Sequence, residues 1–136
     1  MAVIEQLLRE ESDGTISFGN HKLEKKEKVE DFKHAGDLYK VKTYAEMTKL
    51  EKNGMFAYES EPGTSVNHFN ETEAGVTFSV EANEDVQITV GLQDESEYEV
   101  FINNASVGKM NTNLSGKLSI SVELEAVDQI EIKIIK

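Results

Sequence analysis

The sequence predicts an all-β fold: an antiparallel β-sandwich or jelly-roll-like unit with one or two short helices. Two observations support this. In residues 75–135, five segments alternate apolar and polar residues, and successive side chains on a strand point to opposite faces. Each segment therefore has one buried face and one wet face. Polar turns separate the segments at a spacing typical of a sandwich or barrel, not of a parallel sheet with crossover helices.

The first thirty residues are less regular. Residues 2–10 are expected to form a short amphipathic helix, with a strand as the alternative. Residues 13–14, Asp-Gly, predict a turn that leads into a strand over 15–18. Residues 21–28 hold four lysines and two glutamates, which indicates a charge-protected edge strand or a mobile loop, and residues 29–32 predict a further strand.

The best helix candidate covers residues 44–52. Thr43 stands at a plausible N-cap and Glu46 follows three residues later, which is the pattern of a capping box. Lysines lie in the last turn, where the helix dipole favours cations, and Asn53-Gly54 provides a stop. These signals predict a helix between strands.

Strands are expected on both sides of that helix. Residues 36–37 form a turn before a strand over 38–42. After the helix, residues 55–58 and 64–69 are predicted strands, separated by a turn at 61–63 that contains the single proline.

The second half of the chain is the most regular part. Its apolar positions follow one another in five groups: Val76, Phe78 and Val80; Val86, Ile88, Val90 and Leu92; Tyr98, Val100 and Ile102; Leu118, Ile120, Val122 and Leu124; Ile130, Ile132 and Ile134. Polar turns are expected at 83–85, 94–96, 115–116 and 126–128. Asn103-Asn104 suits a tight hairpin, because asparagine tolerates positive φ.

We expect residues 1–136 to form a single compact domain. The composition changes near residue 72, so residues 71–74 are the candidate seam between an irregular N-terminal half and a regular β-meander. The seam separates either two subdomains or the two sheets of one sandwich, and one compact unit is the favoured interpretation.

The composition excludes several classes of function. A formal net charge of −12 repels phosphate backbones and anionic lipids, so we expect no nucleic-acid partner and no membrane partner. The absence of cysteine removes disulfides, thiolate metal sites and cysteine nucleophiles. The N-terminal residues lack the pattern of a signal peptide, and no apolar run is long enough to span a membrane. A cytoplasmic location is therefore expected, unless a leader has been removed.

No residue is predicted to be catalytic, and no cofactor or metal is expected. The three histidines lack zinc spacing, the acidic turns lack the calcium-loop pattern, and Gly-x-Ser-x-Gly is absent. The candidate ligand-binding residues are Tyr58, His68 and Phe69, on the expectation that His68 packs near the two rings. The alternative for His68 is a partly buried histidine with a hydrogen-bond partner.

Phe101 is the candidate interface residue. Its side chain is expected to point to the same, solvent-facing side of the predicted strand as those of Glu97 and Glu99. The leading explanation for an outward phenylalanine is that the first half of the chain covers its ring. The alternatives are a contact with another subunit and a platform for a ligand.

Residues 98–124 resemble the small terminal β-sandwich modules of polysaccharide-active enzymes. The resemblance rests on the hairpin Tyr98-Glu-Val-Phe-Ile-Asn-Asn-Ala-Ser-Val-Gly-Lys and the strand Gly116-Lys-Leu-Ser-Ile-Ser-Val-Glu-Leu. It implies a non-catalytic accessory module.

The whole chain also resembles small bacterial proteins of similar length that carry an "endosialidase" label. The resemblance lies in Met1-Ala-Val-Ile-Glu-Gln-Leu, Gly36-Asp-Leu-Tyr-Lys-Val-Lys and Asn53-Gly-Met-Phe. Sialidases typically hold the substrate carboxylate with three arginines, whereas Arg9 is the single arginine of this chain. The Asp-box has no counterpart, because Ser12-Asp-Gly-Thr differs in spacing and lacks the tryptophan. No catalytic residue is therefore carried over.

The function expected from the sequence is a non-catalytic accessory or binding module for a glycan or another protein. A homo-oligomeric structural protein is the second hypothesis. A glycan hydrolase is the third, since no nucleophile, base and orienting group can be assembled with specificity.

Overall fold

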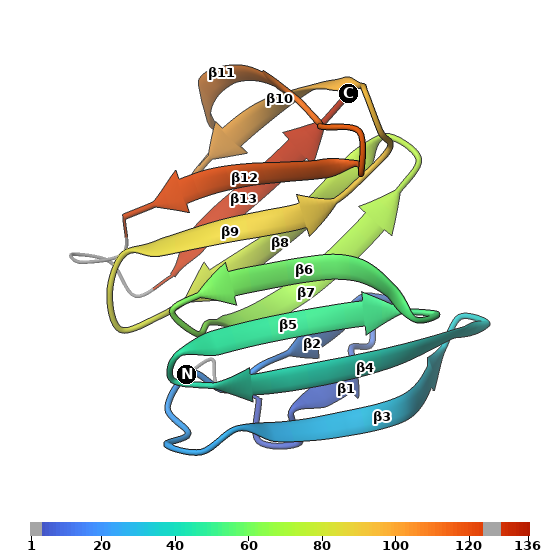
Figure 1. The fold of residues 1–136 in the computed structure, drawn as a ribbon, viewed down its shortest axis with the longest axis vertical. Helices are drawn as coiled ribbons and strands as arrows, with labels where there is room; N and C mark the ends of the chain where they lie inside the picture. The colour runs from blue at the N-terminus through green and yellow to red at the C-terminus, as the bar shows by residue number, and fades with distance from the viewer. Residues whose placement is uncertain (1–3, 124–128) are drawn as a thin grey trace.

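The computed structural model describes residues 4–123 and 129–136, and it confirms the predicted β-sandwich (Figure 1). Two antiparallel sheets pack together, and the described residues contain no helix. The seven-stranded sheet contains, in spatial order, β1 (Leu8–Glu10), β2 (Ile16–Phe18), β7 (Ser65–Thr72), β8 (Gly75–Glu81), β13 (Ile130–Ile135), β10 (Glu97–Ile102) and β11 (Ala105–Asn111). The six-stranded sheet contains β12 (Lys117–Val122), β9 (Val86–Gly91), β6 (Met55–Glu61), β5 (Met47–Lys52), β4 (Asp37–Tyr44) and β3 (Glu27–His34).

The strands of the second half do not form the predicted meander. The consecutive strands β8 and β9 lie in different sheets: β8 pairs with β7 and β13, whereas β9 pairs with β6 and β12. Alternation fixes which residues form a strand, but it does not specify the neighbouring strand. The predicted seam at 71–74 falls in the β7–β8 hairpin, and both sheets contain strands from each side of it. The assignment of one domain stays a prediction.

The predicted helix over 44–52 is wrong. Residues 45–46 form a turn between β4 and β5, with Tyr44 opposite Met47 and Thr43 opposite Thr48. The Thr43 hydroxyl lies 2.8 Å from the Thr48 hydroxyl across this hairpin and does not cap a helix. A nine-residue helix is marginal by itself, and the hairpin instead buries Thr48 and Leu50 on one face.

The N-terminal helix expected over residues 2–10 is also wrong for the residues described. Residues 5–6 form a turn, and Leu7 has a φ of 70°. The alternative prediction, a strand, is correct for residues 8–10, which form β1. Residues 2–3, the end of the fourth alternating segment at Leu124 and the turn at 126–128 lie outside the described residues. The tight hairpin predicted at Asn103-Asn104 is confirmed: both residues have positive φ, and the turn joins β10 to β11, whose seven residues are all exposed and show no alternation.

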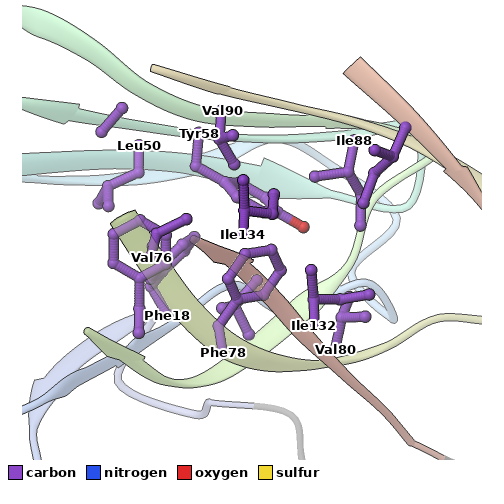
Figure 2. Close-up of a cluster of buried hydrophobic side chains, with 14 of the residues drawn as sticks. Phe18, Leu50, Tyr58, Val76, Phe78, Val80, Ile88, Val90, Ile132 and Ile134 are labelled. Carbon is purple, nitrogen blue, oxygen red and sulfur yellow. The ribbon is translucent and has the colours of Figure 1, made fainter. Parts of the chain in front are cut away.

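The core consists of side chains from both sheets (Figure 2). Each alternating segment contributes its apolar set, and β12 buries Leu118, Ile120 and Val122 while its three other residues are exposed. The centre of the core carries aromatic rings: Tyr58 lies edge-on to Phe18 and Phe78, at centroid distances of 5.3 and 5.5 Å.

A chain of buried hydroxyl groups lies beside these rings. The Thr64 hydroxyl is 2.8 Å from the Tyr58 hydroxyl and 2.9 Å from that of Ser60, and the Thr64 carbonyl accepts a 2.8 Å hydrogen bond from Thr48. Tyr58, Thr48 and Thr64 are fully buried. Because buried polar groups are costly unless paired, this network joins the start of β7 firmly to β5 and β6.

Candidate functional site

Tyr58 and Phe69, two of the predicted ligand-binding residues, lie in the core. Their ring centroids are 6.2 Å apart, and their exposed fractions are 0% and 5%. They stabilise the contact between the sheets and present no surface to a ligand in this structure.

His68 lies on the opposite side of β7 from Phe69 and is exposed. Its φ is 55°, at a bulge between Asn67 and Asn70. Its Nδ1 is 3.1 Å from both the Thr15 hydroxyl and an Asp13 carboxylate oxygen. Hydrogen bonds from Thr15, with His68 close by, lower the pKa of Asp13. The structure therefore does not bring the three predicted residues into one site, and a binding role for His68 stays a prediction.

Phe101, the predicted interface residue, is partly buried on β10. It lies opposite Lys133 of β13, whose amine is 6.0 Å from the centroid of the Phe101 ring. Figure 1 places β10 at the far end of the molecule from β3 and β4. The role of Phe101 in a subunit contact stays a prediction.

A groove of about 780 Å³ lies across one end of the sandwich. The strand ends that line it, those of β5 and β9 among them, point toward the right in Figure 1. The groove is built from the ends of strands of both sheets, with Lys52 and Phe56 on one side and Glu71, Gln93 and Lys136 on the other. Its volume lies within the range of small-molecule sites. Sequence reasoning missed this groove because its walls come from five separate parts of the chain: residues 52–53 and 55–57, 71–73, 91–93 and 98, 115, and 136.

The apolar part of the groove centres on Phe56 and the neighbouring Met55, which is 72% exposed. The Phe56 ring covers Gly91 so closely that a Cβ there would lie 3.2 Å from the ring and 2.5 Å from the Phe56 carbonyl oxygen. The Lys117 amine lies 4.5 Å from the centroid of the Phe56 ring, a cation–π distance. Gly91 and Lys117 together fix the position of this ring.

The polar part of the groove carries both signs of charge. The Lys52 amine lies 3.3 Å from a Glu71 carboxylate oxygen and 3.7 Å from an Asp37 oxygen. Partial burial by itself lowers the pKa of Lys52, but Glu71, with smaller contributions from Tyr39 and Asp37, raises that pKa above its ordinary value. Lys136 donates a hydrogen bond to the Gln93 side chain. The groove thus offers paired charges and amide groups to a polar ligand.

One serine and one histidine lie close enough to resemble a nucleophile and its base. His21 Nδ1 is 2.7 Å from the Ser65 hydroxyl. Ser65 is 0% exposed and His21 is 4% exposed, so no substrate reaches the hydroxyl in this structure. The pair is structural here, and it holds the loop before β3 against the start of β7.

We expect acidification to destabilise the protein through His21. Burial, and secondarily the charge of Lys22, lowers the pKa of His21. Between that lowered pKa and the ordinary value near 6.5, the unfolded chain binds a proton that the folded chain does not. The free energy of unfolding should therefore fall as the pH decreases from about 7.5 to 5.5.

Urea unfolding at both pH values checks this expectation, with His21→Gln as the comparison. The variant should show a smaller pH dependence over this interval. An equal dependence in both proteins would assign the effect to other groups.

The remaining observations limit the chemistry. Within the described residues, no group of three or more histidine, aspartate or glutamate side chains could hold a metal ion, and no helix is long and apolar enough to cross a membrane. Comparison of the chain with protein-family models, curated proteins and solved structures found no match.

Proposed function

We propose that the protein is a non-catalytic binding module that holds a short glycan in the end groove. The observation that carries this proposal is the composition of the groove wall, in which the exposed Met55 and the fixed Phe56 ring adjoin Lys52, Glu71 and Gln93. Sugar rings present apolar CH faces and a rim of hydroxyls. Such a ligand matches a wall that combines an apolar surface with convergent polar groups.

The charges of the groove favour a neutral glycan. Two lysines, Lys52 and Lys136, and two glutamates, Glu71 and Glu73, line the groove, so the local charges balance although the chain carries −12 overall. An anionic glycan would be repelled by the surrounding surface.

Phe56→Ala is expected to weaken glycan binding about tenfold or more, because burying a phenylalanine ring contributes about 1.5–3 kcal/mol. A glycan array identifies the ligand, and titration calorimetry measures the change in Kd. Val107→Ala is the matched control, since Val107 is an exposed apolar residue on β11 outside the groove.

The control variant should bind as the unmodified protein does. Absence of binding across a broad array of neutral glycans would contradict the proposal. Binding that Phe56→Ala leaves unchanged would place the glycan elsewhere.

A further inference from the structure

Tyr98 brings a phenolic hydroxyl to the wall of the end groove. The residue belongs to the core on β10, and its exposed fraction is 2%. Unlike Tyr58 and Phe69, which are similarly enclosed, Tyr98 lines the groove. Its hydroxyl oxygen lies 3.2 Å from the backbone nitrogen of Gln93, another residue of the groove wall. The hydroxyl is therefore the part of Tyr98 that a ligand in the groove can contact.

This hydroxyl has an unused hydrogen-bond donor. Its oxygen accepts a hydrogen bond from the Gln93 amide, and no described residue accepts one from its own hydrogen. A phenol can donate one hydrogen bond while its oxygen accepts another. A buried donor that stays unpaired is costly, and buried polar groups are for this reason paired in nearly all proteins. An oxygen atom of a bound molecule would supply the acceptor for Tyr98.

The acceptor atoms of Gln93, beside this hydroxyl, are already in use. The backbone carbonyl of Gln93 accepts a 2.7 Å hydrogen bond from the Thr112 hydroxyl. The side-chain oxygen of Gln93 accepts one from the Lys136 amine, which leaves the side-chain NH₂ group as a second donor in the groove wall. Tyr98 and Gln93 together therefore present donors to a ligand and no free acceptor on Gln93.

An apolar surface accompanies these donors. Leu92, the neighbour of Gln93 in the chain, lines the groove and packs partly against the core. Ala57, next to the Phe56 ring, is another apolar residue of the wall. Such a wall matches a ligand group that accepts hydrogen bonds through one oxygen and carries a methyl group close to it. A sugar hydroxyl fits less well, because it brings a hydrogen of its own that needs an acceptor.

We propose that the groove selects N-acetylated amino sugars, whose acetamido carbonyl oxygen accepts a hydrogen bond from the Tyr98 hydroxyl. This inference rests on the proposed glycan-binding function and specifies the class of sugar. A carbonyl oxygen has two lone pairs and no hydrogen, so it can also accept a hydrogen bond from the Gln93 side chain. The acetamido methyl group packs on Leu92. The group carries no charge, in agreement with the balanced charges of the groove.

The test compares two trisaccharides that have the same β-linkage, one built from N-acetylglucosamine and the other from glucose. They differ only in that each sugar carries an acetamido group in the first and a hydroxyl in the second. Titration calorimetry of the unmodified protein should give at least about tenfold tighter binding of the acetylated trisaccharide, because a site with buried donors discriminates against a ligand that leaves them poorly paired. This comparison needs no variant.

Tyr98→Phe removes the hydroxyl and keeps the ring. We expect this variant to bind the acetylated trisaccharide about five- to tenfold more weakly than the unmodified protein does. Its affinity for the glucose trisaccharide should stay within a factor of about two. Tyr44→Phe is the matched control, because it removes a hydroxyl from β4 outside the groove and should change neither affinity.

Equal affinity of the unmodified protein for the two trisaccharides would overturn this inference. A preference for the acetylated trisaccharide that Tyr98→Phe leaves unchanged would overturn it too. In both cases, weakening of both affinities by Phe56→Ala would leave the proposed glycan-binding function intact. Failure of both trisaccharides to bind at millimolar concentration would also refute the inference, and the broad glycan array then tests the proposed function separately.

Discussion

Replacing Tyr58 with alanine is expected to lower the free energy of unfolding by about 3–5 kcal/mol, the usual cost of removing a buried aromatic ring. The ring is fully buried between Phe18, Phe69 and Phe78, which belong to the other sheet. Its loss leaves a cavity at the centre of the sandwich. Urea unfolding measured by circular dichroism checks this value.

Tyr58→Phe separates the ring from its hydroxyl. Burial raises the pKa of Tyr58, so the hydroxyl remains neutral and shares a hydrogen bond with Thr64. In this variant Thr64 retains its hydrogen bond with Ser60. We therefore expect the free energy of unfolding to fall by only about 0.5–1.5 kcal/mol. Equal losses in the two variants would show that the hydroxyl network, and not the packing of the ring, dominates.

Gly75→Ala is expected to lower the free energy of unfolding by about 4 kcal/mol or more, a loss that few single substitutions reach. Gly75 begins β8 with a φ of +146°, and a Cβ there would lie 1.9 Å from the carbonyl oxygen of Ile134 on β13. That oxygen belongs to the backbone of a paired strand, so relief of the collision requires β8 and β13 to separate.

Gly14→Ala is the matched control for this effect. Gly14 also has a positive φ, of +88°, but a Cβ there would meet no atom within 4 Å. We expect a loss of about 1–2 kcal/mol from backbone strain alone. A Gly75→Ala variant that unfolds at the same urea concentration as Gly14→Ala would contradict the role assigned to the close approach of β13.

The fold class could be predicted because strand alternation is a local property. Val86, Ile88 and Val90 alternate with polar residues, and β9 buries these three side chains as expected. The partners of β9 could not be predicted, since alternation does not depend on which strand lies alongside. Thr43 and Glu46 match a capping pattern and so predict a helix, whereas the pairing of Thr43 with Thr48 in the β4–β5 hairpin outweighs that local preference.

The candidate site was harder to predict, although part of the error was avoidable. His68 and Phe69 are adjacent on one predicted strand, so their side chains point to opposite faces and could not share a site there. The end groove requires Phe56, Glu71 and Lys136 to meet, and these residues approach one another only after both sheets have formed.

The position of β13 has a consequence for biosynthesis. β13 lies between β8 and β10, so residues 130–135 fill the gap between strands that are made earlier. During translation, β8 and β10 cannot become part of one continuous sheet until β13 has left the ribosome. The nascent chain therefore exposes the unpaired edges of β8 and β10 from their synthesis until residues 130–135 emerge. Pairing across some 50 residues makes the addition of β13 slow compared with the formation of a hairpin.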